Sequence, residues 1–252
     1  MSRIVNIMPM AGLGKRFSNS NFILPKPLIK IKNKPMFIKA SESMPRSRLS
    51  IFICNNKLLK KFKINKIISK KYKKKFKIIS VNRLTKGQAN TCLLAEKYLK
   101  KNDKIFIHSC DSFIKYNYFD LDKKLNNSDA VILTTKPNSL HLKNIKSFGW
   151  VKIKKKKIMK ITCKKKASSK PIKDFVIIGS FGFKNKNIFL KMIKDLIKSK
   201  KKVNNEYYID MAFNHALKNN YKINNLTVKS YTSWGTPKEL INWEKKIAKN
   251  KK

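Results

Sequence analysis

The sequence predicts an α/β fold: a mixed, mainly parallel sheet flanked by helices, with a small inserted β-ribbon. Short apolar runs alternate with helix-length segments through the first half of the chain, which is the pattern of strands joined by helical crossovers. The second half contains two strand-like segments around a lysine-rich turn, which predicts a β-hairpin. A chain of 252 residues can bury one large core, and neither a long linker nor an internal repeat divides it. We therefore expect one domain spanning residues 1–252.

Four apolar runs in the first half are predicted to form parallel strands, at residues 4–8, 49–54, 76–81 and 104–108. Helices are expected between them at residues 34–44, 57–71 and about 85–101. A proline in the first turn favours the first of these helices, and apolar residues at helical spacing favour the second. Because parallel strands joined by crossovers end at one edge of a sheet, ligands are expected at the carboxyl ends of these strands.

The second half is predicted to complete the same sheet and to add three helices. Strands are expected at residues 130–135, 148–154, 157–163, 175–183 and near 222–228. Helices are expected at residues 187–198, 206–219 and 237–249. The segments at 148–154 and 157–163 are the two arms of the ribbon. One mixed-sheet domain explains this order better than two independent domains.

The turn after the first strand has the composition of a phosphate-binding site. It contains Gly12 and Gly14, then Lys15 and Arg16, and it is followed by Lys26 between two prolines. Glycines allow the backbone N–H groups to approach an anion closely, and the cationic side chains can neutralise its charge. The alternative is an ordinary strand-to-helix turn with exposed basic residues.

Two common phosphate motifs are excluded by single residues in this turn. A dinucleotide fingerprint that starts at Gly12 would need a glycine in place of Phe17. A Walker loop would need a glycine in place of Pro9 and a serine or threonine in place of Arg16. The motif that remains is G-x-G-x-R, followed by P-K-P-L at residues 25–28.

The net charge of +48 suggests a nucleic-acid-binding protein at first, but the composition favours another explanation. Only five of the 61 basic residues are arginine, although arginine is the residue best suited to bidentate phosphate and base recognition. Lysine, isoleucine and asparagine, which are all abundant here, are encoded by A/T-rich codons. The lysine runs are also scattered over different predicted elements. We therefore expect solvated lysine-covered surfaces and no specific nucleic-acid partner.

The cysteines and the N-terminal region indicate a cytoplasmic protein. The four cysteines show no C-x-x-C spacing, so neither a zinc ribbon nor a secreted disulfide framework is expected. The apolar N-terminal run is interrupted by Asn6, Pro9 and glycines, and it is too short for a membrane span. No membrane insertion or processing is expected.

The sequence resembles the sugar-phosphate nucleotidyltransferases, also called nucleotide-sugar pyrophosphorylases, over nearly its whole length. The resemblance implies a GT-A/Rossmann-like fold, with residues 1–135 as the nucleotide-binding half and residues 136–252 as the sugar-phosphate-binding half. The motifs that carry it are at residues 11–17, 25–28, 34–36, 85–89, 111, 205–208 and 234–237.

The resemblance implies that a nucleoside triphosphate binds over the glycine turn and that a sugar 1-phosphate attacks its α-phosphorus, releasing pyrophosphate. Such transfer depends on alignment and on neutralising phosphate charge. Arg16 would hold the leaving phosphates, and Lys26 would bridge the acceptor phosphate and the α-phosphate. Gln88 would read the nucleobase edge, with Gly87 leaving room for the ring. The nucleotide-binding residues implied by the resemblance are Ala11, Gly12, Gly14, Lys15 and Gln88.

The resemblance also implies a magnesium ion, held by Asp111 at the end of the fourth strand. Members of this family usually carry a second metal-binding aspartate just before the late Gly-Thr, where this chain has no carboxylate. Asp210 is the substitute that the sequence suggests, although an acid in the first turn of a helix is equally expected from the helix dipole. A sugar-contacting Glu-Lys pair is also replaced, by Cys163 and Lys164. Gly149 and Glu206 are the expected sugar contacts.

Three alternatives stay open beside an enzyme that makes nucleotide sugars for surface polysaccharide. The same fold could act on another phosphorylated acceptor such as phosphocholine. It could retain nucleotide binding with impaired catalysis, because the second acid is missing. A basic nucleic-acid-binding protein would explain the charge but not the glycine turn. A homo-oligomer is possible, and the sequence identifies neither the base nor the sugar.

Overall fold

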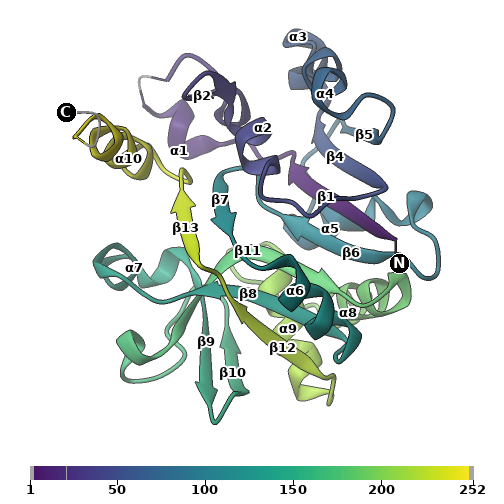
Figure 1. The fold of residues 1–252 in the computed structure, drawn as a ribbon, viewed down its shortest axis with the longest axis vertical. Helices are drawn as coiled ribbons and strands as arrows, with labels where there is room; N and C mark the ends of the chain where they lie inside the picture. The colour runs from purple at the N-terminus through teal and green to yellow at the C-terminus, as the bar shows by residue number, and fades with distance from the viewer. Residues whose placement is uncertain (1–2, 21, 250–252) are drawn as a thin grey trace.

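A nine-stranded sheet forms the centre of the computed structural model, which describes residues 3–20 and 22–249 (Figure 1). Its strands follow the order β10-β9-β11-β6-β1-β4-β5, with β8 paired to β11 and β12 paired to β8. Two small two-stranded sheets, β2-β3 and β7-β13, stand beside it. The predicted mixed sheet is thus confirmed, and both halves of the chain contribute strands to it.

The four strands predicted in the first half are parallel neighbours. They are β1 (Ile4–Met10), β4 (Leu49–Asn55), β5 (Phe76–Val81) and β6 (Lys104–His108). The strand β1 lies between β4 and β6, and β5 lies outside β4. Their carboxyl ends therefore lie at one edge of the sheet, as predicted.

The helices that connect these strands are shorter than predicted. They are α2 (Met36–Ser41), α3 (Asn56–Lys61), α4 (Ile64–Tyr72) and α5 (Gln88–Leu93). The helix predicted at 57–71 is divided because Lys63 adopts a left-handed conformation with φ 48°, which interrupts the helical hydrogen bonds. The helix predicted at 34–44 begins only at Met36, because Pro35 is extended and belongs to β3 (Lys34–Pro35), the partner of β2 (Lys30–Ile31).

The predicted ribbon is confirmed as β9 (Gly149–Lys154) and β10 (Lys157–Thr162). Lys155 and Lys156 form its two-residue turn with φ 47° and 63°, the left-handed pair that a type I′ turn requires. The ribbon extends the central sheet, because β9 pairs with β11 (Phe175–Phe183).

The long strand β11 joins the two halves of the sheet. Its first residues pair with β9, and its last residues pair antiparallel with β6. Gly179, with φ 72°, marks the bend between these two pairings. This bend of β11 lies next to the carboxyl end of β6, where the Gly179 carbonyl accepts a hydrogen bond from the Ser109 N–H.

Side-chain alternation along the central strands divides the core between the two faces of the sheet. In β1, Val5 and Ile7 belong to one buried cluster, and Met8 and Met10 belong to another. The first cluster packs against α5, α8 (Lys186–Lys198) and α9 (Ile209–Lys218), and the second packs against α2 and α4. The predicted helices at 187–198 and 206–219 are confirmed, although the second begins at Ile209.

Several short elements were not predicted. They are α1 (Lys15–Ser18), β7 (Ser112–Lys115), α6 (Tyr118–Asn126), α7 (Ser139–Lys143) and β13 (Ser230–Ser233). The predicted strands β8 (Ala130–Thr135) and β12 (Ile223–Thr227) and the helix α10 (Pro237–Lys249) are present. Among the described residues, no helix is long and apolar enough to cross a membrane.

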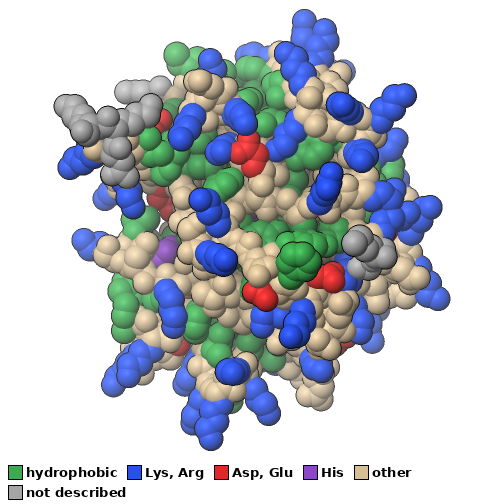
Figure 2. Space-filling model, viewed as in Figure 1, with side chains coloured by type: hydrophobic (Ala, Val, Ile, Leu, Met, Phe, Trp, Pro, Cys, Tyr) green, Lys and Arg blue, Asp and Glu red, His purple; other side chains and the backbone are tan. Residues whose placement is uncertain are grey.

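Lysine and arginine side chains are spread over the face of the molecule shown in Figure 2. They project from the upper, central and lower parts of this face, and acidic side chains occur between them. This distribution agrees with solvated lysine-covered surfaces rather than one basic groove.

Candidate active site

Two cavities meet at the carboxyl ends of β1 and β6. The first, of about 590 Å³, is lined by the glycine turn at residues 11–15, by residues 109–111, and by the loop before α5. The second, of about 450 Å³, extends from residues 109 and 111 toward the ribbon and α9. Both cavities are lined by Gln88, Ser109, Asp111 and Tyr208. They can therefore hold two ligands in contact with each other.

The glycine turn is open where a phosphate would approach it. A Cβ atom added to Gly12 would meet no atom within 4 Å, so the backbone here faces free space. Gly14 has φ 64°, and a Cβ atom on it would stand 3.2 Å from Cβ of Lys26. Glycine at 14 therefore allows Lys26 to pack against the turn. The predicted nucleotide-binding residues Ala11, Gly12, Gly14 and Lys15 all line the first cavity.

Lys26 contacts Asp111, which lines both cavities, and itself lines a neighbouring cavity together with residues 12–14. Its Nζ donates to Oδ2 of Asp111 at 2.5 Å and to the Gly235 carbonyl at 3.1 Å. The side chains of Lys26 and Asp111 are only 17% and 24% exposed, so this ion pair is shielded more than a surface pair. The structure thus brings together the glycine turn, the predicted bridging lysine and the predicted metal ligand.

The pairing keeps both groups charged. Burial alone would lower the pKa of Lys26, but the Asp111 carboxylate outweighs this effect and the pKa is raised. Burial alone would raise the pKa of Asp111, but the Lys26 ammonium outweighs it and the pKa is lowered. The site therefore holds an ionised carboxylate and an ammonium group at neutral pH.

The small sheet of β7 and β13 brings the late Trp-Gly-Thr segment to Asp111. Ser233 pairs with Ser112, and the Trp234 N–H donates to the Asp111 carbonyl at 2.8 Å. Because this pairing brings β13, near the end of the chain, beside β7, the helix α10 starts next to the site (Figure 1).

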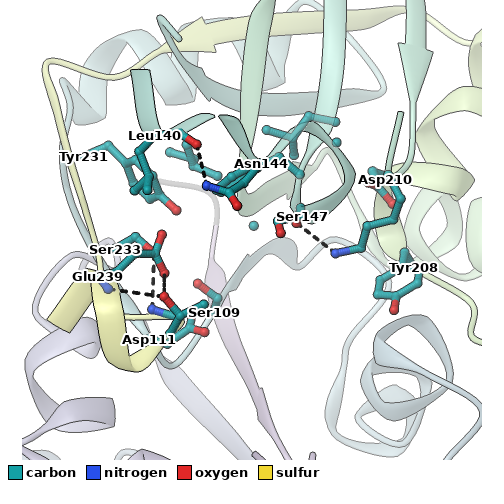
Figure 3. A pocket seen from close by; sticks show the side chains of 18 of the residues that line it. Ser109, Asp111, Leu140, Asn144, Ser147, Tyr208, Asp210, Tyr231, Ser233 and Glu239 are labelled. Atoms are coloured by element: carbon teal, nitrogen blue, oxygen red, sulfur yellow. Dashed lines mark hydrogen bonds between the residues drawn. The ribbon is translucent and has the colours of Figure 1, made fainter. Parts of the chain in front are cut away.

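Glu239, in the first turn of α10, supplies a carboxylate near Asp111 that the sequence analysis missed. A Cβ atom on Gly235 would stand 3.2 Å from Oε2 of Glu239, 3.3 Å from Oγ of Ser233 and 3.5 Å from Oδ2 of Asp111. Three oxygen atoms therefore surround the space that glycine at 235 leaves free, and Figure 3 shows their side chains grouped at one end of the second cavity. The available signal was the capping-box spacing of Thr236 and Glu239, whose side chains are hydrogen-bonded at 3.0 Å.

Asp210 does not lie with Asp111. It lines the opposite end of the second cavity, as Figure 3 shows, at the start of α9. A Cβ atom on Gly149 would stand 2.4 Å from Oδ2 of Asp210, so this carboxylate occupies the space beneath the ribbon. The structure therefore does not support the expectation that Asp210 shares a metal ion with Asp111, and Glu239 is the nearer carboxylate. Gly149 lines the second cavity, as expected of an acceptor contact.

In the loop before α5, Gly87 makes room for a different group from the one we expected. Gly87 has φ 111°, and a Cβ atom on it would stand 2.6 Å from the Tyr207 nitrogen. Glycine at 87 therefore makes room for the backbone of Tyr207, whereas we expected it to make room for a nucleobase. Gln88 lines both cavities. Glu206 lines the cavity of the glycine turn, while Gly149 lines the other, so the two expected sugar contacts are not in the same cavity.

Lys238 and two further cations line the second cavity. One is Arg16, the residue expected to hold leaving phosphates. The other is Lys164, which sequence analysis had considered only as part of a replaced pair; its Nζ donates to the Ser147 carbonyl at 2.8 Å, and burial lowers its pKa. The side chains of Arg16 and Lys164 can therefore contact an anionic ligand in this cavity.

His108 next to the site has a structural role. Its ring nitrogens contact the Ser180 hydroxyl at 2.7 Å and the Ser112 carbonyl at 3.1 Å, and burial lowers its pKa to about 4. It therefore stays neutral and joins β6, β7 and β11. Within residues 3–20 and 22–249, no group of three or more histidine, cysteine or acidic residues could hold a metal ion. A metal here would need oxygen ligands from the bound phosphates as well.

Comparison with known proteins agrees with this geometry. The family model described as "Nucleotidyl transferase" matches residues 6–250. A mannose-1-phosphate guanyltransferase from Yarrowia lipolytica is 30% identical over 133 residues, and a homologous one from Debaryomyces hansenii is 29% identical over 135 residues. In each case the match covers 50% of this chain but only 36% of the relative's length.

Solved structures share the fold over nearly the whole chain. A nucleoside-diphosphate-sugar pyrophosphorylase from Vibrio cholerae RC9 superposes with a TM-score of 0.78 at 19% identity, covering 95% of this chain and 99% of that one. The inositol-1-phosphate CTP transferase from T. maritima superposes with a TM-score of 0.71 at 12% identity, covering 95% and 92%. The family match along nearly the whole chain confirms the resemblance drawn from the motifs: this protein belongs to the nucleotidyl transferase family.

Proposed function

We propose that this protein transfers a nucleotidyl group from a nucleoside triphosphate to a sugar 1-phosphate, with release of pyrophosphate. The observation that carries the proposal is the Lys26–Asp111 pair at the junction of two cavities. The first cavity has the open glycine turn that a triphosphate needs. The second has room and cationic side chains for a phosphorylated acceptor. A nucleotide sugar made in this way would serve surface polysaccharide synthesis.

The reaction forms a bond between an acceptor phosphate oxygen and the α-phosphorus and breaks the bond from the α-phosphorus to the leaving pyrophosphate. Lys26 would stabilise the negative charge on the oxygens of both phosphates, because its ammonium contacts Asp111, which lines both cavities. The N–H groups of the glycine turn would hold the leaving phosphates. Arg16, which was expected to hold them too, lines the acceptor cavity and would neutralise phosphate charge from that side. Alignment of the two ligands supplies most of the remaining rate enhancement.

A magnesium ion is expected to assist, and Asp111, Glu239 and Ser233 offer oxygen atoms around the space beside Gly235. This donor set fits Mg²⁺, which prefers carboxylate, phosphate and water oxygens. When bound, the ion would supply neutralisation of phosphate charge. Glu239 lines the acceptor cavity and Asp111 lines both cavities, so an ion held between them would lie where the two phosphates meet.

The test is a pyrophosphate-release assay of each nucleoside triphosphate against a panel of acceptors, with and without Mg²⁺. The panel includes mannose 1-phosphate, glucose 1-phosphate, inositol 1-phosphate and phosphocholine. Magnesium-dependent release with at least one sugar 1-phosphate is expected. Release only with phosphocholine would replace the acceptor class, and silence across the whole panel would remove the proposed activity.

A nucleic-acid-binding function is tested in the same preparation by titration with duplex DNA at 50 and 200 mM salt. Binding through many phosphate contacts loses affinity by orders of magnitude between these conditions. We expect only weak binding, because the basic side chains on the face shown in Figure 2 are dispersed.

A further inference from the structure

A separate cavity of about 240 Å³ lies beside α9, and we call it the α9 cavity. It is bounded by the end of β10, the end of α8 and one side of α9, and α9 packs against both of the other elements (Figure 1). Its lining shares no described residue with the two cavities of the candidate active site. The lining residues are 161–163, 165, 196, 199, 201–203, 211, 214, 215 and 218.

One stripe of α9 forms a wall of the α9 cavity. Met211, Asn214, His215 and Lys218 follow one another at intervals of three, one and three residues, which places them on a single face of the helix. The side chains of Asn214 and His215 are half-buried, and neither forms a hydrogen bond within the described part of the chain. An amide and an imidazole that are partly withdrawn from water need hydrogen-bond partners. A ligand in the cavity can supply them.

The rim of the α9 cavity is cationic. Lys165, Lys201, Lys202 and Lys218 line it, and no acidic residue among those described does. None of these four lysines forms an ion pair within residues 3–20 and 22–249, although the Lys202 ammonium lies 5.4 Å from the centre of the Tyr207 ring. A concave surface that carries charge of one sign concentrates counter-ions. The rim therefore favours an anion.

The floor of the α9 cavity is apolar. Ile161 and Leu196 are buried there, and Val203 and Met211 are half-buried. Ligand pockets usually measure about 300–1,000 Å³, so this cavity is large enough for a ring but small for a whole nucleotide sugar. The combination of apolar floor and cationic rim therefore fits a compact ring with an anionic group at its edge.

We propose that the α9 cavity is a binding site for a small phosphate ester that carries an apolar ring. The ring would lie on the apolar floor, where its polar substituents can reach Asn214 and His215, and the phosphate would be held by the lysine rim. Lysines alone would not distinguish this cavity in so basic a chain. The half-buried amide and imidazole without partners, above an apolar floor, do distinguish it.

The wall of the α9 cavity is shared with the second cavity of the candidate active site. Cys163 and Lys165 line the α9 cavity, whereas Lys164 between them lines the second cavity. On α9, Met211 lines the α9 cavity and Asp210 lines the second one. The Cys163 thiol is hydrogen-bonded to the Asp210 carboxylate, so it connects the two cavities. A ligand in the α9 cavity would contact this connection, and we expect its binding to change the affinity for the acceptor.

The experiment measures binding of phenyl phosphate by calorimetry, with phenol and inorganic phosphate as the two halves of the probe. Nucleoside monophosphates form a separate arm, which shows whether a nucleotide or a simpler aryl phosphate is preferred. The variants are Asn214→Ala and the double substitution Lys201→Glu with Lys218→Glu. The matched control is Lys101→Glu with Lys123→Glu, which changes the net charge equally at two exposed lysines outside the α9 cavity. Thermal melting reports folding.

Phenyl phosphate is expected to bind the wild type at least about tenfold more tightly than inorganic phosphate does, because its ring is buried. The Lys201/Lys218 variant should weaken this binding at least about tenfold and Asn214→Ala about threefold, while the control changes it less than about twofold. Absence of binding to the wild type would overturn the inference. Equal weakening in the control and in the Lys201/Lys218 variant would also overturn it, since the lysines would then act only through net charge.

The effect on the active site is measured as the calorimetric Kd of mannose 1-phosphate with and without saturating phenyl phosphate. A change of about fivefold is expected in the wild type and none in the Lys201/Lys218 variant. A change of the same size in that variant would show competition within the active site and would contradict the connection through Cys163. The α9 cavity does not depend on the proposed function: a wild type that binds no sugar phosphate would contradict that function, while the phenyl phosphate titration would still decide the site.

Discussion

The two ends of the second cavity carry the same residue type in opposite electrostatic situations. At one end Asp111 faces an ammonium group 2.5 Å away, and its pKa is lowered. At the other end Asp210 has an unsatisfied oxygen, and burial raises its pKa to about 6. The first arrangement is complete without a ligand and is suited to hold charged phosphates in place. The second is incomplete, because a buried carboxylate oxygen has no hydrogen-bond partner among the described residues.

The substitution Lys26→Ala should have the largest effect, because it removes the cation that pairs with Asp111. Without its ammonium the phosphates lose a cation at the point of transfer, and turnover is expected to fall about 10²–10³-fold. Asp111 would then be buried without a cation, so its pKa should rise. The control is Lys30→Ala, because Lys30 is exposed and four residues further along the chain. Near-normal turnover in a folded Lys26→Ala protein would show that another lysine bridges the phosphates.

Substituting the two glycines that flank these carboxylates should affect stability differently. In Gly149→Ala the new Cβ would stand 2.4 Å from Oδ2 of Asp210 and 2.8 Å from Cδ1 of Ile177, so we expect a loss of about 1–3 kcal/mol in unfolding free energy. In Gly235→Ala the nearest atom is 3.2 Å away, and the loss should be below about 1 kcal/mol.

The Gly235→Ala protein is also expected to need more Mg²⁺ for half-maximal activity, because its methyl group occupies the space between Asp111 and Glu239. Chemical denaturation and a magnesium titration of activity separate the two effects. An equal loss of stability in both variants would mean that the surroundings of Gly149 and Gly235 are packed equally tightly.

The Asp111 end of the second cavity was largely predictable from the sequence, whereas the Asp210 end was not. The glycine turn and Asp111 each follow a predicted strand, so their meeting followed from the parallel topology, whereas Lys26 was assigned from the motif that resembles the family's. Glu239 comes to Asp111 only through the pairing of β7 with β13, four-residue strands too short to show clear periodicity. Asp210 was suggested as the second metal ligand because no carboxylate precedes the late Gly-Thr, and its distance from Asp111 depends on how α9 packs beneath the ribbon. The packing role of Gly87 was not predicted, because this glycine lies against Tyr207, which is far along the chain.

The pH dependence of stability should also have opposite signs at the two ends. The pKa of Asp111 is lowered, so its contribution to stability is present above the unfolded value and is lost as the pH falls through the folded value. The pKa of Asp210 is raised from 3.8 to about 6, so its ionisation destabilises the fold as the pH rises through that interval.

Asp210→Asn should therefore gain about 2–3 kcal/mol relative to the wild type between pH 4 and pH 7. Denaturation of both proteins across this range measures the difference. It also cancels the contribution of His108 and His141, whose lowered pKa values act in an overlapping interval with the opposite sign. A difference that stays constant with pH would show that Asp210 is not destabilised by burial.

The smallest expected effect tests whether the acceptor end depends on the stiffness of the ribbon. The double substitution Lys155→Asn with Lys156→Gly places the residues that a type I′ turn favours at two left-handed positions. We expect a gain of about 1 kcal/mol in unfolding free energy, because lysine pays for its left-handed conformation and the new pair does not. The turn lies at the far end of β9 from Gly149, so the acceptor KM should stay within twofold of the wild-type value. A larger change in KM with the nucleotide KM unaltered would show that ribbon motion, and not only the fixed position of Asp210 beside Gly149, controls acceptor binding.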